Sequence, residues 1–217
     1  MEEIFNAKKT SILMMRDRGY TISPDEEQVL DLDQLPGHFT DRIQLLHALA
    51  MNYRHVLRPE YTILRFTSSY EGEGHSVSTK TIQQYTGDIA QERRNHPDLK
   101  IYFVLIGDSP NNNNITTAMN GVGADAWQYF ELEELQSSPV AHVSQPVYTK
   151  LSPEQDKEKT KELKTTPNGV DGMLETDPVA RWYWYKAGDL IMIERDYEVI
   201  DAFTPIRVNY RRVLRAL

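Results

Sequence analysis

Residues 100–106 read KIYFVLI, a continuous apolar run that gives the strongest strand signal in the chain. A run without polar alternation is typical of a strand buried on both faces, so we expect a central strand here. Residues 61–67 are rich in β-branched and aromatic residues and predict another strand. Apolar residues at helical spacing predict a helix over 79–94, and residues 127–135 predict a strand that passes into a turn of helix.

Two helices are predicted before these strands. The first spans Ile4 to Arg18 and ends at Gly19, a residue suited to a helix C-terminus. The second begins at Ser23-Pro24, where Ser is the expected N-cap and Pro the first helical residue. Helical spacing from Asp41 to Tyr53 predicts a further helix, with an insertion or a loop as the alternative.

A domain boundary is expected near Ser137-Ser138-Pro139. Beyond it, Val140–Thr149 predicts a strand. Ser152-Pro153 repeats the cap pattern and predicts a helix to about Leu163.

Asp177 and Pro178 predict the N-cap and first residue of another helix, which Gly188 would end. The elements expected in this part are a helix over 179–185 and strands over 190–193 and 206–211. The mixture of helices and strands favours an α/β (α+β mixed) fold in two domains, 1–138 and 139–217.

The charge of the chain is unevenly distributed. The net charge is −8, and residues 1–140 hold 12 basic and 20 acidic residues, whereas residues 141–217 hold 12 of each. An acidic domain binds DNA poorly by itself, because affinity for phosphate depends on Lys and Arg contacts. Any nucleic-acid contact would be local or held in place by a larger partner.

The sequence offers little for a catalytic or cofactor site. It contains no cysteine, which excludes thiolate nucleophiles and Cys-based metal sites, and its six histidines lack metal-ligand spacing. It has no P-loop, G-x-G-x-x-G or G-x-S-x-G motif. We expect no cofactor and no transmembrane helix.

One enzymatic alternative is an Mg²⁺-dependent nuclease, which needs carboxylates and a lysine at the end of a sheet. The candidate residues are Glu60, Glu71, Glu73 and Lys80. A solvated turn explains the same charges.

Two clusters near the C-terminus suggest a binding surface. Four consecutive aromatic residues, Trp182–Tyr185, cannot all face one side of a helix, so some are exposed or packed on a partner. The second cluster contains Arg207, Arg211, Arg212 and Arg215, which would bind an acidic protein or a nucleic acid unless they form a solvated basic edge.

Residues 177–183 read DPVARWY and are followed by Lys186-x-Gly188 and Arg195. This pattern resembles the C-terminal signature of the fifth subunit shared by eukaryotic nuclear RNA polymerases, a family that includes an archaeal counterpart. Residues 208–213, VNYRRV, resemble the closing strand of that family, and His142 and Pro146 resemble its H-x-L-x-P segment.

The opening helix supports the same resemblance independently. Lys9-Thr10 and the run Asp17-Arg18-Gly19-Tyr20 resemble the eukaryotic form. The resemblance extends over about 4–26, 80–106 and 139–217. Two departures, at Val170–Met173 and at Trp184, suggest a divergent polymerase such as that of a large DNA virus.

The resemblance implies a non-catalytic subunit with a nuclease-like N-terminal jaw domain beside downstream DNA and a smaller C-terminal assembly domain. The implied partners are the largest polymerase subunit, the smaller shared subunits and, weakly, duplex DNA, with one copy per hetero-oligomer. The implied location is the nucleus, or a cytoplasmic viral factory or virion. An adaptor that reuses the assembly domain in another complex is the remaining alternative.

The resemblance also assigns candidate residues. Those expected to bind partners are Asp177, Pro178, Arg181, Trp182, Tyr183, Lys186, Gly188, Arg195, Tyr210 and Arg211. Those expected near DNA lie in the loop after the central strand, where the free N–H groups of a helix start suit phosphate. They are Ser109, Pro110, Asn111, Asn112, Thr116 and Thr117.

Overall fold

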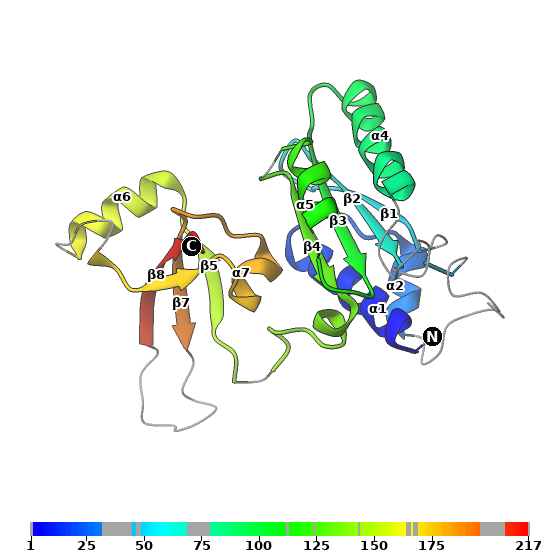
Figure 1. Cartoon of the computed structure of the whole chain (residues 1–217). Coiled ribbons are helices and arrows are strands. Elements are labelled where there is room, and N and C mark those ends of the chain that lie inside the picture. The colour runs from blue at the N-terminus through cyan, green and yellow to red at the C-terminus, as the bar shows by residue number, and fades with distance from the viewer. Residues whose placement is uncertain are drawn as a thin grey trace. The chain divides into compact units, whose positions relative to one another are not determined.

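The structure, a computed structural model, describes residues 2–31, 45–46, 49–68, 79–111, 113–123, 125–142, 144–163, 166, 169–195 and 207–216. The chain divides into two compact units, Met1–Ser137 and Ser138–Leu217 (Figure 1). Each unit combines helices with a four-stranded mixed sheet, which confirms the expected α/β (α+β) class. None of the helices within the described residues is long and apolar enough to cross a membrane.

The sheet of the first unit has the order β1-β2-β3-β4. Its strands are β1 (Met51–Arg54), β2 (Glu60–Thr67), β3 (Lys100–Gly107) and β4 (Trp127–Glu131). β1 runs antiparallel to β2, whereas β2, β3 and β4 are parallel. β3 lies between two partners, and its Val104 and Ile106 have no exposed surface, so the prediction of a buried central strand is confirmed.

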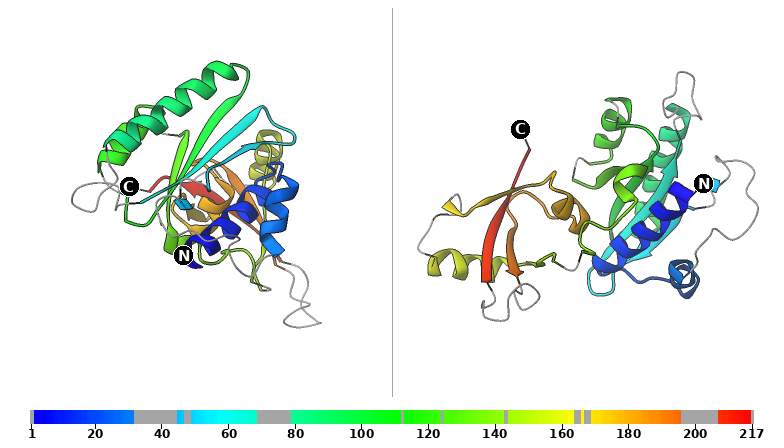
Figure 2. Two further views of the ribbon diagram at one scale, coloured as in Figure 1. Left: turned by 90° about the vertical axis from the view of Figure 1, so that its right-hand side faces the viewer. Right: turned by 90° about the horizontal axis from the view of Figure 1, so that it is seen from below.

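Helices cover both faces of this sheet (Figure 2). α4 (Thr79–Asn95) and α5 (Asn113–Asn120) cover one face, and α1 (Glu2–Asp17) lies on the other, beside the short 3-10 helix η2 (Leu132–Leu135). Apolar side chains from α4, α5 and the strands form one core, namely Ile63, Ile82, Tyr85, Ile89, Ile101, Phe103, Leu105, Ile115, Met119 and Tyr129. A β-α-β crossover with a buried parallel sheet is the arrangement that the apolar run of β3 predicts.

The two helices at the N-terminus begin and end as expected. Gly19 adopts a φ of +87° at the end of α1. Before α2 (Pro24–Asp31), the amide of Glu26 donates to Ser23 Oγ at 3.3 Å, and the amide of Ser23 donates to the Glu26 carboxylate at 3.0 Å. This reciprocal capping box is the feature that the Ser-Pro-x-Glu pattern predicts.

The helix predicted from Asp41 to Tyr53 is wrong at its end. Residues 51–54 form β1, with Met51 and Tyr53 buried and Asn52 and Arg54 exposed. This two-residue alternation fits an edge strand better than a helix. Residues 41–44 and 47–48 lie outside the described residues.

The sheet of the second unit has the order β5-β7-β8-β6. Its strands are β5 (Val147–Lys150), β6 (Gly172–Leu174), β7 (Leu190–Arg195) and β8 (Arg207–Leu214). β6 has no counterpart in the sequence prediction. β5 is shorter than the expected strand over 140–149, because Pro146 has no N–H to donate to a ladder.

Two helices accompany this second sheet. α6 (Pro153–Glu162) begins at the predicted Ser152 cap, whose Oγ accepts the amide of Gln155. α7 (Pro178–Tyr183) begins at the predicted Asp177 cap but ends earlier than expected. Trp184, not Gly188, ends α7 in the left-handed conformation, with a φ of 57°.

α6 is held to its sheet by polar contacts, since none of its described side chains is buried. The guanidinium of Arg212 on β8 donates from both terminal nitrogens to Asp156, with Nη2 2.8 Å from Oδ1. The same group donates to the carbonyl of Gly188 at 2.9 Å. Arg212 is 7% exposed, so it does not belong to the basic surface that the sequence predicted for it.

We expect Arg212→Ala to lower the free energy of unfolding by about 2–3 kcal/mol, because it leaves the Asp156 carboxylate without its partner. The matched control is Arg211→Ala, which removes the exposed neighbour on the same strand and should change stability by less than about 0.5 kcal/mol. Urea unfolding of the full chain measures both. Equal effects would contradict the anchoring role of Arg212.

Acid should remove this difference between the wild-type chain and Arg212→Ala. The hydrogen bond from Arg212 holds the pKa of Asp156 below its ordinary value of 3.8. A carboxyl group whose pKa is lower in the folded state stabilises the fold at pH values above its unfolded-state pKa. This stabilisation is lost as the pH falls through the folded-state pKa.

Candidate functional site

The D-P-V-A-R segment builds the start of α7. Asp177 Oδ1 accepts the amide of Val179 at 2.8 Å, and Pro178 occupies the first helical position. Ala180 has no exposed surface, so it allows the helix to lie close to the sheet. Val179 and Ala180 share a core with residues of β6, β7 and β8, namely Met173, Ile191, Ile193 and Val213.

The aromatic run is divided between the interior and the surface. Trp182 is 1% and Tyr185 7% exposed, so this chain's own atoms cover both side chains. Tyr183 and Trp184 are half-buried. Because Trp182 is covered already, Tyr183 and Trp184 are the aromatic side chains of this run that a partner can reach.

The half-buried aromatic residues Tyr183 and Trp184 each contact a neighbouring side chain. The ring of Tyr183 stacks on that of Tyr185, with centroids 5.3 Å apart and an interplanar angle of 19°. Lys186 Nζ lies 4.8 Å from the centroid of the Trp184 ring, within the range of a cation–π contact. The aromatic surface after α7 is therefore ordered before any partner binds.

The Lys-x-Gly segment forms a turn between α7 and β7. The amide of Lys186 donates to Asp189 Oδ2 at 2.8 Å, and Lys150 Nζ lies 2.8 Å from the same oxygen. Gly188 has a φ of +97°, donates to the carbonyl of Val213 and accepts from Arg212. Gly188 therefore holds the backbone of the turn in place and offers no side chain to a partner.

The strand register places the remaining candidate partner-binding residues on two different faces of the sheet. In the β7–β8 ladder, Ile191 pairs with Arg211, and Arg195 pairs with Arg207. Arg195 and Arg211 thus lie on the face that α7 covers in part, and both are exposed. Tyr210 lies on the opposite face, where Lys159 of α6 is 5.3 Å from its ring.

The expected partner-binding set therefore does not form one surface. Arg181 and Tyr183 are half-buried, and Arg195 and Arg211 are exposed. Tyr210 faces α6, whereas Asp177, Pro178 and Gly188 shape the backbone.

The loop expected near DNA lies at the carboxyl end of β3. Asn111 Nδ2 donates to Thr116 Oγ1 at 3.1 Å, and Ser109, Pro110 and Thr117 belong to the same edge of the sheet. Asn112 lies outside the described residues. The carboxyl edge of a parallel sheet is a common place for ligand contacts.

A buried tyrosine fixes the start of this loop. The hydroxyl of Tyr129 donates to the carbonyl of Ser109. Burial raises the pKa of Tyr129 to about 12, so the hydroxyl keeps its proton. A Cβ at Gly107 would collide with this hydroxyl, so the close approach requires glycine.

The nuclease candidates do not meet in the described structure. Glu60 lies at the amino end of β2, 3.4 Å from Arg58. α4 begins at the carboxyl end of β2, where Tyr85 donates to the carbonyl of Phe66 at 3.1 Å.

Lys80 is the second residue of α4. Its backbone is therefore about 20 Å from Glu60, the length of the strand between them, which is too far for a shared metal ion. Glu71 and Glu73 lie outside the described residues. Among the residues that are described, no group of three or more His, Asp or Glu side chains could hold a metal ion.

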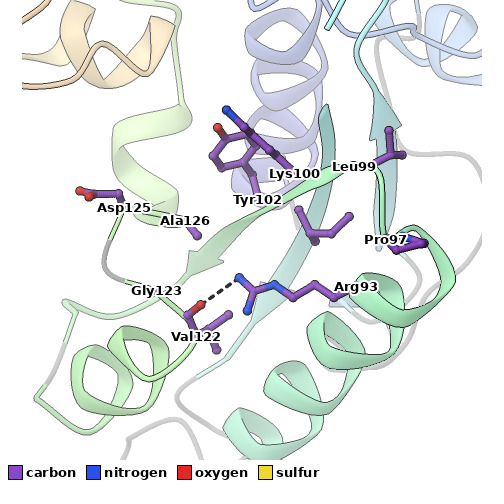
Figure 3. A pocket seen from close by; sticks show the side chains of 10 residues that line it. Arg93, Pro97, Leu99, Lys100, Tyr102, Val122, Gly123, Asp125 and Ala126 are labelled. Carbon is purple, nitrogen blue, oxygen red and sulfur yellow. Dashed lines mark hydrogen bonds between the residues drawn. The ribbon is translucent and has the colours of Figure 1, made fainter. Parts of the chain in front are cut away.

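An open hollow lies at the amino ends of β3 and β4 (Figure 3). The guanidinium of Arg93 reaches across it and donates to the carbonyl of Val122 at 2.8 Å. Lys100 and Asp125 also line the hollow, so it contains charges of both signs. Arg93 therefore joins α4 to the α5–β4 connection.

Residues 138–213 match the family model of RNA polymerase Rpb5, C-terminal domain. The match covers nearly all of the second unit and none of the first. A search of curated proteins gives no match. The second unit is therefore similar to the C-terminal domain of RNA polymerase Rpb5.

The family match thus concerns residues 138–213, about a third of the chain. The resemblance drawn from Asp177–Tyr183 is thus confirmed.

Gly188→Ala should lower the free energy of unfolding by about 1 kcal/mol, because an L side chain is strained at this positive φ. No neighbouring atom would meet the new Cβ, so the cost comes from the backbone. Gly87→Ala is the matched control, since Gly87 is exposed within α4 and also has no neighbour near its Cβ. It should stabilise the chain by about 0.5–1 kcal/mol, since alanine favours a helix. Urea unfolding that shows the same sign for both variants would contradict this assignment.

Proposed function

We propose that this chain is a non-catalytic subunit that helps to assemble a multisubunit DNA-directed RNA polymerase by docking on the largest subunit. The Rpb5 match over residues 138–213 carries this proposal. The docking surface is the α7 face of the second unit. Arg181 and Tyr183 contribute half-buried side chains, and Arg195 and Arg211 contribute exposed guanidinium groups.

The chemistry of this surface suits docking. Arginine forms planar, bidentate hydrogen bonds with carboxylates and tolerates partial burial, and tyrosine contributes a large rigid area. The α7 face presents these groups on a cap, a turn and strands that are themselves well anchored. Nucleotide addition then belongs to the large subunits, and this chain needs no cofactor.

We infer a second role for the first unit, that of a jaw beside downstream DNA. Residues 109–117 have no charged side chain and include the first turn of α5, whose positive dipole end suits phosphate. Asp108 and Glu131 lie at the same edge of the sheet. The contact is therefore weak and depends on the larger subunits holding the DNA.

The location of the chain follows that of its polymerase. A cellular enzyme places it in the nucleus, and a viral enzyme places it in a cytoplasmic viral factory or in the virion.

Tagged full-length chain should recover the two largest polymerase subunits and the smaller shared subunits from its native source, as identified by mass spectrometry. Arg181→Ala with Tyr183→Ala should reduce that recovery at least about fivefold, because a few central Arg and Tyr residues dominate interface energy. Lys157→Ala with Lys161→Ala, two exposed residues of α6, is the control and should recover as much as wild type. Unrelated partners would mean that an adaptor has reused the domain.

A photo-crosslinking residue at Asn111 should crosslink to downstream duplex DNA in the purified polymerase. The same residue at Asp125, which is exposed near the opposite edge of the sheet, is the control. Crosslinks from position 111 to protein alone would reject the jaw contact while leaving the assembly role intact.

A further inference from the structure

The α7 face of the second sheet carries two exposed arginines, Arg195 and Arg211. The β7–β8 register places Arg195 on this face at one end of the ladder, and it places Arg211 on the same face, opposite Ile191. Both guanidinium groups therefore belong to one face of the sheet, four residues apart in its register.

These arginines differ from their neighbour on the other face. Arg212 is buried and paired with Asp156. Arg195 and Arg211 are exposed, and within the described part of the chain neither makes a hydrogen bond or an ion pair. No described residue therefore uses their guanidinium donors.

A half-buried tyrosine lies on the same face, on the neighbouring strand β5. Tyr148 of β5 pairs with Ile193, the residue midway between Ile191 and Arg195 on the same face. Burial raises the pKa of its hydroxyl, and the charges of Arg195 and Arg211 act in the opposite direction, so both guanidinium groups lie within electrostatic range of it. The nearby acid, Asp177, is engaged by the amide of Val179.

We propose that this face, formed by Tyr148, Arg195, Asn209 and Arg211, binds an extended acidic segment of a polymerase partner through its Asp or Glu carboxylates. The inference rests on the proposed function, because it names the chemistry of the partner at the assembly surface. Arg195 and the partner position of Arg211 are four residues apart on β7, or about 13 Å. Carboxylates at positions i and i+4 of an extended peptide have the same spacing and the same direction.

The charge distribution favours a peptide over a nucleic acid. The chain carries a net charge of −8, so a polyanion with one charge every few ångströms is repelled by the rest of the molecule. A short acidic segment brings only the two or three charges that the arginines neutralise.

The direct test uses the full-length chain and a fluorescent ten-residue Gly-Ser peptide that carries two glutamates four residues apart, and it measures fluorescence anisotropy at low salt. Arg195→Glu with Arg211→Glu should weaken binding at least about tenfold, because charges opposed across an interface repel. Lys157→Glu with Lys161→Glu changes the net charge equally on α6 and should weaken binding less than about twofold. Equal weakening by the two pairs would overturn the proposal, as would tighter binding of a ten-nucleotide single-stranded RNA than of the peptide.

Loss of folding would not explain the expected result. Arg195 and Arg211 are exposed and make no hydrogen bond or ion pair within the described residues, so replacing them removes no such contact. The urea midpoint of the variant should therefore lie close to that of wild type.

The same variants separate this inference from the proposed function. If wild-type chain recovers the polymerase and the Arg195→Glu, Arg211→Glu variant recovers it equally well, the acidic-segment proposal fails and the assembly role stands. If wild-type chain recovers no polymerase, the assembly role fails. Selective binding of the two-glutamate peptide by the Arg195–Arg211 face would then still show what this surface recognises.

Discussion

The buried guanidinium of Arg212 joins three parts of the second unit. It pairs with Asp156 of α6, lies on β8 in the sheet, and donates to the carbonyl of Gly188 in the turn after α7. A buried charge needs such a set of partners, since an unpaired guanidinium in the interior is costly. The turn joins α7, which carries Arg181 and Tyr183, to β7, which ends at Arg195. The position of the proposed docking surface therefore depends on a buried residue.

In the first unit, the parallel arrangement of β2, β3 and β4 has a comparable effect. It places the helix starts and the Ser109–Thr117 loop at the carboxyl edge and the hollow beside Arg93 at the amino edge. At the carboxyl edge, the uncharged loop is hydrogen-bonded to Tyr129. At the amino edge, Arg93 joins α4 to the connection between α5 and β4. The two edges of one sheet thus present different chemistry, and a jaw role needs only the first.

Local patterns in the sequence predicted the elements that depend on local physics. The apolar run of β3 and the caps at Ser23, Ser152 and Asp177 involve neighbours in the chain, so they could be read directly. β1 was missed because Ala50 and Tyr53 continue the helical spacing of Ile43 and Leu46, whereas the alternation of Met51 and Tyr53 spans only four residues. β6 was missed because three residues give no periodicity, and its place in the sheet is set by pairing with β8.

The site was predicted less completely than the fold. The motif identified the family but did not show that Trp182 is covered, that Tyr210 faces α6, or that Arg212 is buried. Each of these facts depends on which face of a strand or helix meets another element, and that is decided by tertiary packing. Arg212 directly follows Arg211 in the sequence. The alternation of side chains along β8 places the two on opposite faces of the sheet.

The attachment of α6 to the sheet also affects how much sequence variation this domain tolerates. Its described side chains include none that is buried, and its contacts with the Arg212 side chain come from Asp156 and Thr160, one helical turn apart. Lys159 also lies over the ring of Tyr210, and the remaining positions are exposed or half-buried and place fewer demands on residue type. Homologous domains could therefore differ widely in this segment while keeping the same fold, provided that an acceptor pair at this spacing meets the arginine. Alignments that weight α6 by overall identity would then underestimate how closely two such domains are related.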